Sequence, residues 1–191
     1  ETRNIFENLS CLDHRYSLSE KEVFNKLSQY ISEEASVRSC AKAEAALVKA
    51  HLSVRGQLTP EIEKKLDDVA TNIDPQEVYE EEEKTQHFIR ALVNVLKTKV
   101  DADIAPLIHL GATSVDVLDT ALSMRMRDVT QNVVLPELKA LEVALCNIAD
   151  REAEIHKLDA HTDNMQFQSH LDGQLQNLLA VLENQFFALK N

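Results

Sequence analysis

The amino-acid sequence predicts an all-α protein, and three observations support that fold class. Ala, Leu, Glu and Lys are abundant, whereas the 191 residues include only 3 glycines, 4 prolines and no tryptophan. Apolar residues recur at steps of three and four along most of the chain, which is the period of an amphipathic helix. Hydrophobic residues make up 44% of the sequence, which is enough to form a buried core.

The first helices are predicted from their start and stop signals. After an irregular arm over residues 1–16, Ser17 and Glu20 have the spacing of a capping box, so a helix should follow. A second helix is predicted over about 33–52, and Gly56 stands where its C-terminal stop belongs.

Two helices that begin with proline are predicted next. Thr59 and Pro60 combine an N-cap residue with a proline at the first helical position, which predicts a short helix. Asp74 and Pro75 do the same for a helix over about 75–98.

The longest apolar pattern begins at Ser114 and continues to Ile148. It predicts a helix of about 35 residues, which exceeds a compact domain and favours a bundle shared between chains. Pro136 interrupts the pattern, so a kink or local break is expected there. A last helix is predicted over about 171–186.

One domain boundary is predicted, near residue 105. The shorter helices before it are expected to form a helical N-terminal domain over residues 1–105. The long helices after it are expected to form a partial central helical bundle over residues 106–191.

The composition and charge of the chain limit the kinds of partner that it is expected to bind. The net charge of −12 at pH 7 argues against nucleic acid, although it leaves room for a local cationic pocket that binds an anionic metabolite. The three cysteines are far apart and predict reduced thiols in a cytoplasmic protein. No apolar run approaches the roughly 20 residues that span a bilayer, so we expect no membrane partner.

The segment from His109 to Asp116 is the most informative part of the chain. Gly111 frees the backbone, and Thr113 and Ser114 place two hydroxyls at the start of the long helix. Unpaired N–H groups of a first helical turn bind carboxylates and phosphates. Spacing alone leaves two interpretations open, an anion site or an ordinary helix N-cap.

Other candidate residues are weaker when taken singly. His87 can act as acid, base or phosphate partner, and Arg15 with Tyr16 can clamp a phosphate. Each can equally be an ordinary surface or structural residue. A polar stretch over 156–170 contains His156, His161 and other polar groups, but its spacing fits no familiar ligand pattern, so we expect no metal site and no cofactor.

The order of these segments resembles a known family, the adenylosuccinate lyases of the fumarase/aspartase superfamily. Three segments carry the resemblance: Ser10-x-Leu12-Asp13-x-Arg15-Tyr16-Ser17, Lys84-Thr85-Gln86-His87, and His109-Leu110-Gly111-Ala112-Thr113-Ser114-Val115-Asp116-x-x-Asp119-Thr120. They occur in register from about residue 4 to about residue 155. The Arg-Tyr pair favours this branch of the superfamily, because the other branches have no nucleotide phosphate to hold.

The resemblance implies a helical N-terminal domain, a truncated fumarase/aspartase-type central bundle and a homo-oligomer formed through the long helices. It implies β-elimination of fumarate from adenylosuccinate in purine biosynthesis, with adenylosuccinate or AMP as a purine nucleotide partner. By the same resemblance, Arg15 and Tyr16 would hold the phosphate. Thr113 and Ser114 would hold a succinyl carboxylate, and Gln86 and His87 would lie at the substrate.

Departures from the family pattern point to a second interpretation. Phe88 follows His87 where the family has Asp or Asn, and Gln86 stands where the family usually has Arg. Asp163 aligns with the general-acid histidine, and the loop that carries the general base has no counterpart. We therefore expect no intact catalytic residue in this chain alone, with His87 at most auxiliary. The alternative is a catalytically inert oligomerisation or nucleotide-binding module.

Overall fold

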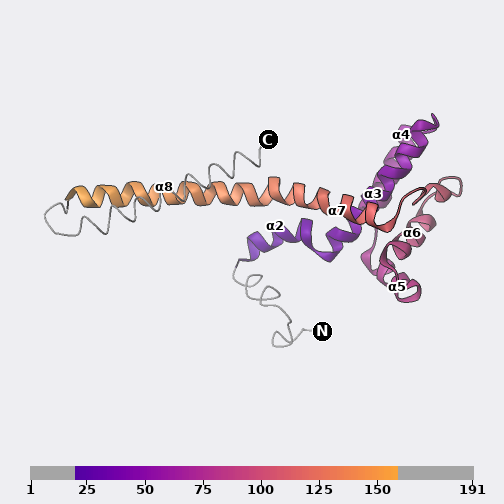
Figure 1. The fold of residues 1–191 in the computed structure, drawn as a ribbon, viewed down its shortest axis with the longest axis horizontal. Helices are drawn as coiled ribbons and strands as arrows, with labels where there is room; N and C mark the ends of the chain where they lie inside the picture. The colour runs from indigo at the N-terminus through magenta and orange to yellow at the C-terminus, as the bar shows by residue number, and fades with distance from the viewer. Residues whose placement is uncertain (1–19, 159–191) are drawn as a thin grey trace. The chain divides into compact units, whose positions relative to one another are not determined.

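The computed structural model describes residues 20–158, which form helices and loops and contain no strand (Figure 1). The all-α fold class is therefore confirmed. The chain divides into two compact units, Glu1–Val129 and Thr130–Asn191. This division differs in position from the domain boundary expected near residue 105, which stays a prediction.

The first unit is built around one long helix, α3, which contacts every other α-helix that the structure describes between residues 20 and 129. Helices α5 and α6 lie side by side and pack against it, as do α2, α4 and α7 (Figure 1). The elements of this unit are α2 (Lys21–Ile31), α3 (Glu33–Val54), α4 (Pro60–Thr71), α5 (Pro75–Thr85), α6 (Phe88–Lys99), the 3-10 turn η3 (Ala105–Leu107) and α7 (Ser114–Val129).

The starts of α4 and α5 follow the predicted capping chemistry, and α3 begins with an N-cap of the same kind. The side chains of Ser32, Thr59 and Asp74 each accept a hydrogen bond from a backbone N–H in the first turn of α3, α4 and α5. Gly56 adopts a left-handed conformation, with φ of +66°, just beyond the end of α3, as its predicted role as a stop requires. The predicted cap at Ser17 lies outside the described residues.

The prediction of one helix over residues 75–98 is wrong. Gln86 has a φ of +51°, in the left-handed region, and it ends α5. His87 then occupies the N-cap position of α6 and accepts a hydrogen bond from the Arg90 N–H through its ring. The apolar period continues across the break, so periodicity alone does not reveal it.

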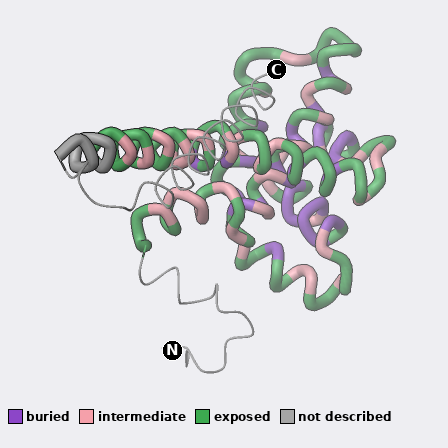
Figure 2. The backbone as a smooth tube through the Cα atoms, turned by 60° about the vertical axis from the view of Figure 1, so that its left-hand side comes forward, coloured by how far each residue is buried: buried purple, intermediate pink, exposed green. Residues whose placement is uncertain are grey.

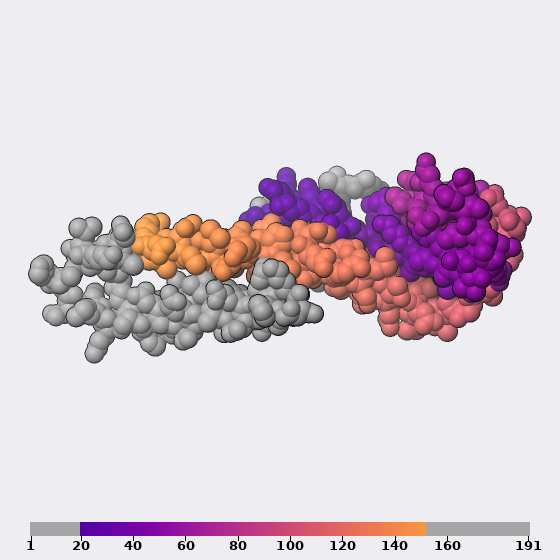
Figure 3. Space-filling view, turned by 90° about the horizontal axis from the view of Figure 1, so that it is seen from above, coloured from indigo at the N-terminus to yellow at the C-terminus, as the bar shows by residue number. Residues whose placement is uncertain are grey.

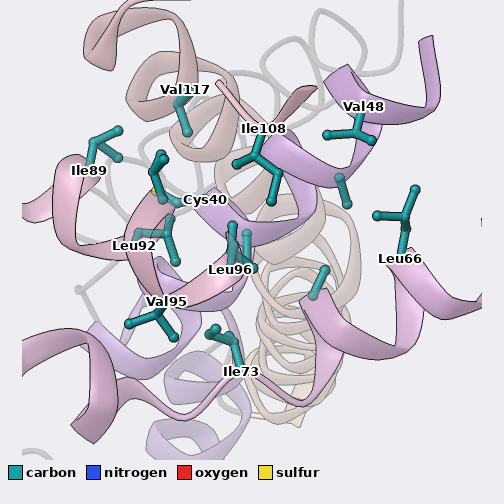
Figure 4. Packing of buried hydrophobic residues seen from close by; sticks show 14 of the residues in the cluster. Cys40, Val48, Leu66, Ile73, Ile89, Leu92, Val95, Leu96, Ile108 and Val117 are labelled. Carbon is teal, nitrogen blue, oxygen red and sulfur yellow. The ribbon is translucent and has the colours of Figure 1, made fainter. Parts of the chain in front are cut away.

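A single apolar core holds the first unit together. Leu92, Leu96 and Ile108 meet Cys40 and Val48 of α3 in this core (Figure 4). Leu92 is fully buried, with 0% of its surface exposed. Burial raises the pKa of the Cys40 thiol to about 11, so the thiol stays protonated and packs as a small apolar group. In the space-filling view, the purple atoms of α3 and α4 and the pink atoms near residue 100 form one continuous surface (Figure 3).

The second unit begins with a π-helical turn, η4 (Thr130–Val134), followed by α8 (Leu135–Leu158). Pro136 has no N–H to donate to the preceding turn, so the predicted interruption takes the form of this π-helical turn. Between Leu135 and Arg151, α8 contains no buried residue (Figure 2). The helix predicted over 171–186 lies outside the described residues. No helix within residues 20–158 is long and apolar enough to cross a bilayer.

Replacing Leu92 by alanine tests the core. We expect Leu92→Ala to lower the free energy of unfolding by about 2–5 kcal/mol, because the cavity opens at a fully buried position. Leu118→Ala removes the same atoms from a side chain that is 40% exposed, and it should cost about 1 kcal/mol or less. Urea unfolding followed by far-UV circular dichroism measures both. Equal losses for the two variants would contradict the described core.

Candidate anion-binding site

A buried carboxylate anchors the loop that leads to α7. Glu44 lies in the middle of α3 and is only 1% exposed. Its Oε2 accepts a hydrogen bond from the His109 backbone N–H at 2.9 Å, and its Oε1 lies 2.7 Å from His109 Nδ1, which donates to it. A buried carboxylate without partners is strongly unfavourable, so these two bonds fix the position of His109 against α3.

The same loop contains two residues with left-handed backbone conformations. His109 has a φ of +62° and Gly111 has a φ of +76°. The His51 Nε2 group lies 2.9 Å from the Leu110 carbonyl oxygen between them and donates a hydrogen bond to it. The two hydrogen-bonded histidines offset the cost of the left-handed conformation at His109, which glycine tolerates and other residues rarely adopt.

Thr113 and Asp116 close the first turn of α7. The backbone N–H of Thr113 donates to Asp116 Oδ2 at 2.8 Å, and the Thr113 hydroxyl donates to the same oxygen at 3.0 Å. Both bonds hold the pKa of the Asp116 carboxyl below its usual range, and the backbone bond has the larger effect. The Thr113 hydroxyl is therefore engaged with Asp116.

Ser114 and His87 meet although they are 27 residues apart in the sequence. Ser114 is the first residue of α7, and His87 is the N-cap of α6. The Ser114 Oγ lies 3.4 Å from His87 Nε2. Because His87 Nδ1 accepts from the Arg90 N–H, the neutral ring carries its proton on Nε2, the nitrogen that faces Ser114. The structure thus brings together a hydroxyl, an imidazole N–H and two helix N-termini.

These groups line a cleft of about 490 Å³. Four of its lining residues are basic or carry an imidazole, and none is acidic, although the chain has a net charge of −12. The positive ends of two helix dipoles add to this local positive potential. The cleft is lined by His87, Ile89, Arg90, Val93, Lys97, Ile108, His109 and Ser114.

Two of the predicted residues do not line this cleft. The side chain of Gln86 donates to the Glu83 carbonyl oxygen at 2.8 Å, and Thr113 binds Asp116. Arg15, Tyr16 and Asp163 lie outside the described residues, so their predicted roles stay predictions. In residues 20–158 no three His, Cys, Asp or Glu side chains gather as metal ligands would.

Sequence reasoning missed Glu44, Arg90 and Lys97. Glu44 is an acidic residue at a core position of α3, and a charge on the apolar face of a helix is a usable signal of a buried partner. Arg90 and Lys97 follow His87 at spacings of three and ten residues, so they share its side of α6. That relation becomes apparent only when the helix is known to restart at His87.

Substituting Glu44 tests the anchor of the loop. We expect Glu44→Ala to lower the free energy of unfolding by about 1–3 kcal/mol, because two partly buried donors of His109 lose their acceptor. Glu44→Gln keeps one carbonyl oxygen and should cost less. Lys42→Ala, at an exposed position of the same helix, should change stability by about 0.5 kcal/mol or less.

Chemical denaturation gives the stabilities, and the ¹⁵N shifts of the His109 ring report its hydrogen bond directly. An unchanged His109 ring signal in Glu44→Ala would contradict the described contact.

Comparison with known proteins agrees with the all-α fold. A family model described as "Lyase" matches residues 14–160. The adenylosuccinate lyase of Archaeoglobus fulgidus is 31% identical over 138 residues, which are 72% of this chain and 27% of that protein. The adenylosuccinate lyases of Methanocaldococcus jannaschii and Pyrococcus horikoshii are 28% and 29% identical, over 76% and 73% of this chain.

The chain spans less than a third of the length of these relatives, with 29% and 30% of the latter two covered. The matched residues contain both helix starts that form the cleft, His87 and Ser114. Because the family model covers most of the sequence, this chain belongs to the lyase family, as a partial member of the fumarase/aspartase superfamily.

Proposed function

We propose that this chain forms the carboxylate-binding part of an adenylosuccinate lyase-type site. The observation that carries the proposal is the 3.4 Å approach of the Ser114 hydroxyl to His87 Nε2, at the starts of two helices. Helix N-termini bind anions through free N–H groups and the positive end of the helix dipole. The relatives that bear the name adenylosuccinate lyase support the choice of substrate.

In this proposal the ligand is adenylosuccinate, and the reaction is the β-elimination of fumarate in purine biosynthesis. Ser114, with Thr113 beside it, binds a succinyl carboxylate, and His87 donates from Nε2 to the same part of the substrate. Gln86 lies next to His87, and Arg15 and Tyr16 hold the nucleotide phosphate. AMP binds through the phosphate and purine alone.

We also propose that this chain alone does not release fumarate. β-Elimination needs a base that removes a proton next to a carboxylate and an acid that protonates the leaving nitrogen. Asp163 aligns with the family's general acid, and an aspartic acid of ordinary pKa is ionised near pH 7. The residues that line the cleft include no carboxylate that could serve as base. The cytoplasmic location of the protein also stays a prediction.

Replacing Ser114 by alanine tests the proposed carboxylate site. Adenylosuccinate and fumarate, added at millimolar concentration, are expected to shift the amide signals of Ser114 and of the first turn of α6. Ser114→Ala should weaken fumarate binding about threefold to tenfold, because one hydrogen bond to a charged group is lost. Ser123→Ala, at an exposed position of the same helix, should bind as the unaltered chain does.

Absorbance of adenylosuccinate, followed over time, should show no turnover by the chain alone. Turnover that Ser114→Ala abolishes would overturn the proposed lack of activity. Absence of any shift with either ligand would overturn the proposed binding site.

A second function, helical self-association, is favoured by the exposed apolar side chains of α8 and of Val134, the last residue of η4. Val134, Leu141 and Ile148 are 39%, 48% and 45% exposed and are spaced seven residues apart. Leu138 and Leu145 complete the alternating steps of four and three that define a heptad stripe. Such a stripe packs against another helix, so we propose that α8 forms part of a homo-oligomer.

Adding one charge to the stripe tests self-association. The unaltered chain is expected to be larger than a monomer by light scattering with size-exclusion chromatography. Leu141→Asp should shift it towards the monomer, because an unpaired carboxylate would be buried in the interface. Asn147→Asp adds the same charge outside the stripe and should leave the mass unchanged. A clean monomer for the unaltered chain would contradict this function.

A further inference from the structure

Two cations in the cleft, Arg90 and Lys97, have no role in the function proposed above. We propose that they make the cleft selective for a doubly charged oxyanion, which Arg90 binds directly beside His87 and Ser114 and which Lys97 attracts from two turns further along α6. The location of the ligand and its dicarboxylate character rest on the proposed function, whereas the recognition of its second charge by Arg90 and Lys97 is new.

Arg90 lies where it can bind the same anion as His87. It follows His87 by three residues, and its backbone N–H is bound to the His87 ring, so the two side chains rise from one turn of α6. Both residues line the cleft together with Ser114. The planar guanidinium group of arginine matches a carboxylate or phosphate in a bidentate pair.

Lys97 extends the positive surface along the cleft. It follows Arg90 by seven residues, which places it on the same face of α6 and about 10 Å away along the helix axis. The apolar Val93 lies between them and also lines the cleft. The charge of Lys97 at this distance attracts a second negative group of the ligand. Because Lys97 is exposed, salt weakens this attraction.

Neither cation is neutralised within the described part of the chain. Lys99, on the same helix, forms an ion pair with Glu77, and Lys65 pairs with Asp101. No such acidic partner contacts the side chain of Arg90 or Lys97 among residues 20–158, and α6 itself contains no acidic residue. The whole chain has a net charge of −12, yet the cations of this cleft have no acidic partner among residues 20–158 and its lining contains no carboxylate. This local positive charge favours an anionic ligand.

The structure therefore points to a ligand that carries two negative charges, such as a dicarboxylate or a phosphate monoester. Fumarate and crotonate provide a matched pair of probes, because they share one carbon skeleton and differ by one carboxylate. Inorganic phosphate is a third probe, which presents the same charge without a carboxylate.

The experiment measures the affinity of each probe from the amide shifts of Ser114 and the His87 ring signals, with the full chain at low salt. We expect fumarate to bind at least about fivefold more tightly than crotonate. Arg90→Gln should weaken fumarate binding about fivefold. Arg90→Lys should restore only part of that loss, because lysine keeps the charge but lacks the planar guanidinium group that binds a carboxylate through two hydrogen bonds. Lys97→Gln should weaken fumarate binding about twofold at low salt. At 0.5 M salt, this variant and the unaltered chain should bind fumarate with the same affinity. Lys42→Gln removes an equal charge outside the cleft and should have no effect.

The outcomes separate the two proposals. Fumarate binding that Ser114→Ala weakens and Arg90→Gln does not would overturn this inference and leave the proposed function standing. Phosphate binding that depends on Arg90, without any fumarate binding, would support the inference and overturn the succinyl-carboxylate function. Equal affinity for fumarate and crotonate would overturn the selectivity for two charges. If the unaltered chain binds none of the three probes, both proposals are overturned.

Discussion

The two hydrogen bonds between Glu44 and His109 are the constraint on which the cleft depends. Glu44 lies in the core of the first unit, so its carboxylate needs both donors from His109 to compensate for its loss of water. Those donors come from the loop that leads to α7. The interaction therefore sets the position of Ser114 relative to α3, and α3 in turn packs on α6 and its N-cap His87. A buried charge thus specifies the geometry of a cleft that it contacts through His109 without lining it.

The sequence predicted the fold class and most helix starts because those features are local. Thr59 and Asp74 cap helices through bonds to residues two or three positions away. The break at Gln86 was not predicted, because a left-handed residue within an apolar period leaves no trace in the spacing. Its cost is offset by the ring of His87, which caps the next helix.

The candidate site was predictable only in part, because motifs reveal local features and not contacts between distant segments. His87, Thr113 and Ser114 were found from motifs, and the structure places His87 and Ser114 in contact. Thr113 instead binds Asp116, a partner that competes for its hydroxyl within the same turn. Glu44, Arg90 and Lys97 depend on contacts between segments far apart in the chain or on the true start of α6, and neither is visible as a motif.

The break at Gln86 also insulates the cleft from changes in the length of the chain. In one continuous helix, an inserted residue in α5 would rotate every later side chain by about 100°. Here α6 restarts at His87, which sets its own first turn through its ring. The rotation of α6 about its axis is therefore set by its own cap, so a change in the length of α5 does not by itself turn His87, Arg90 and Lys97 away from the cleft.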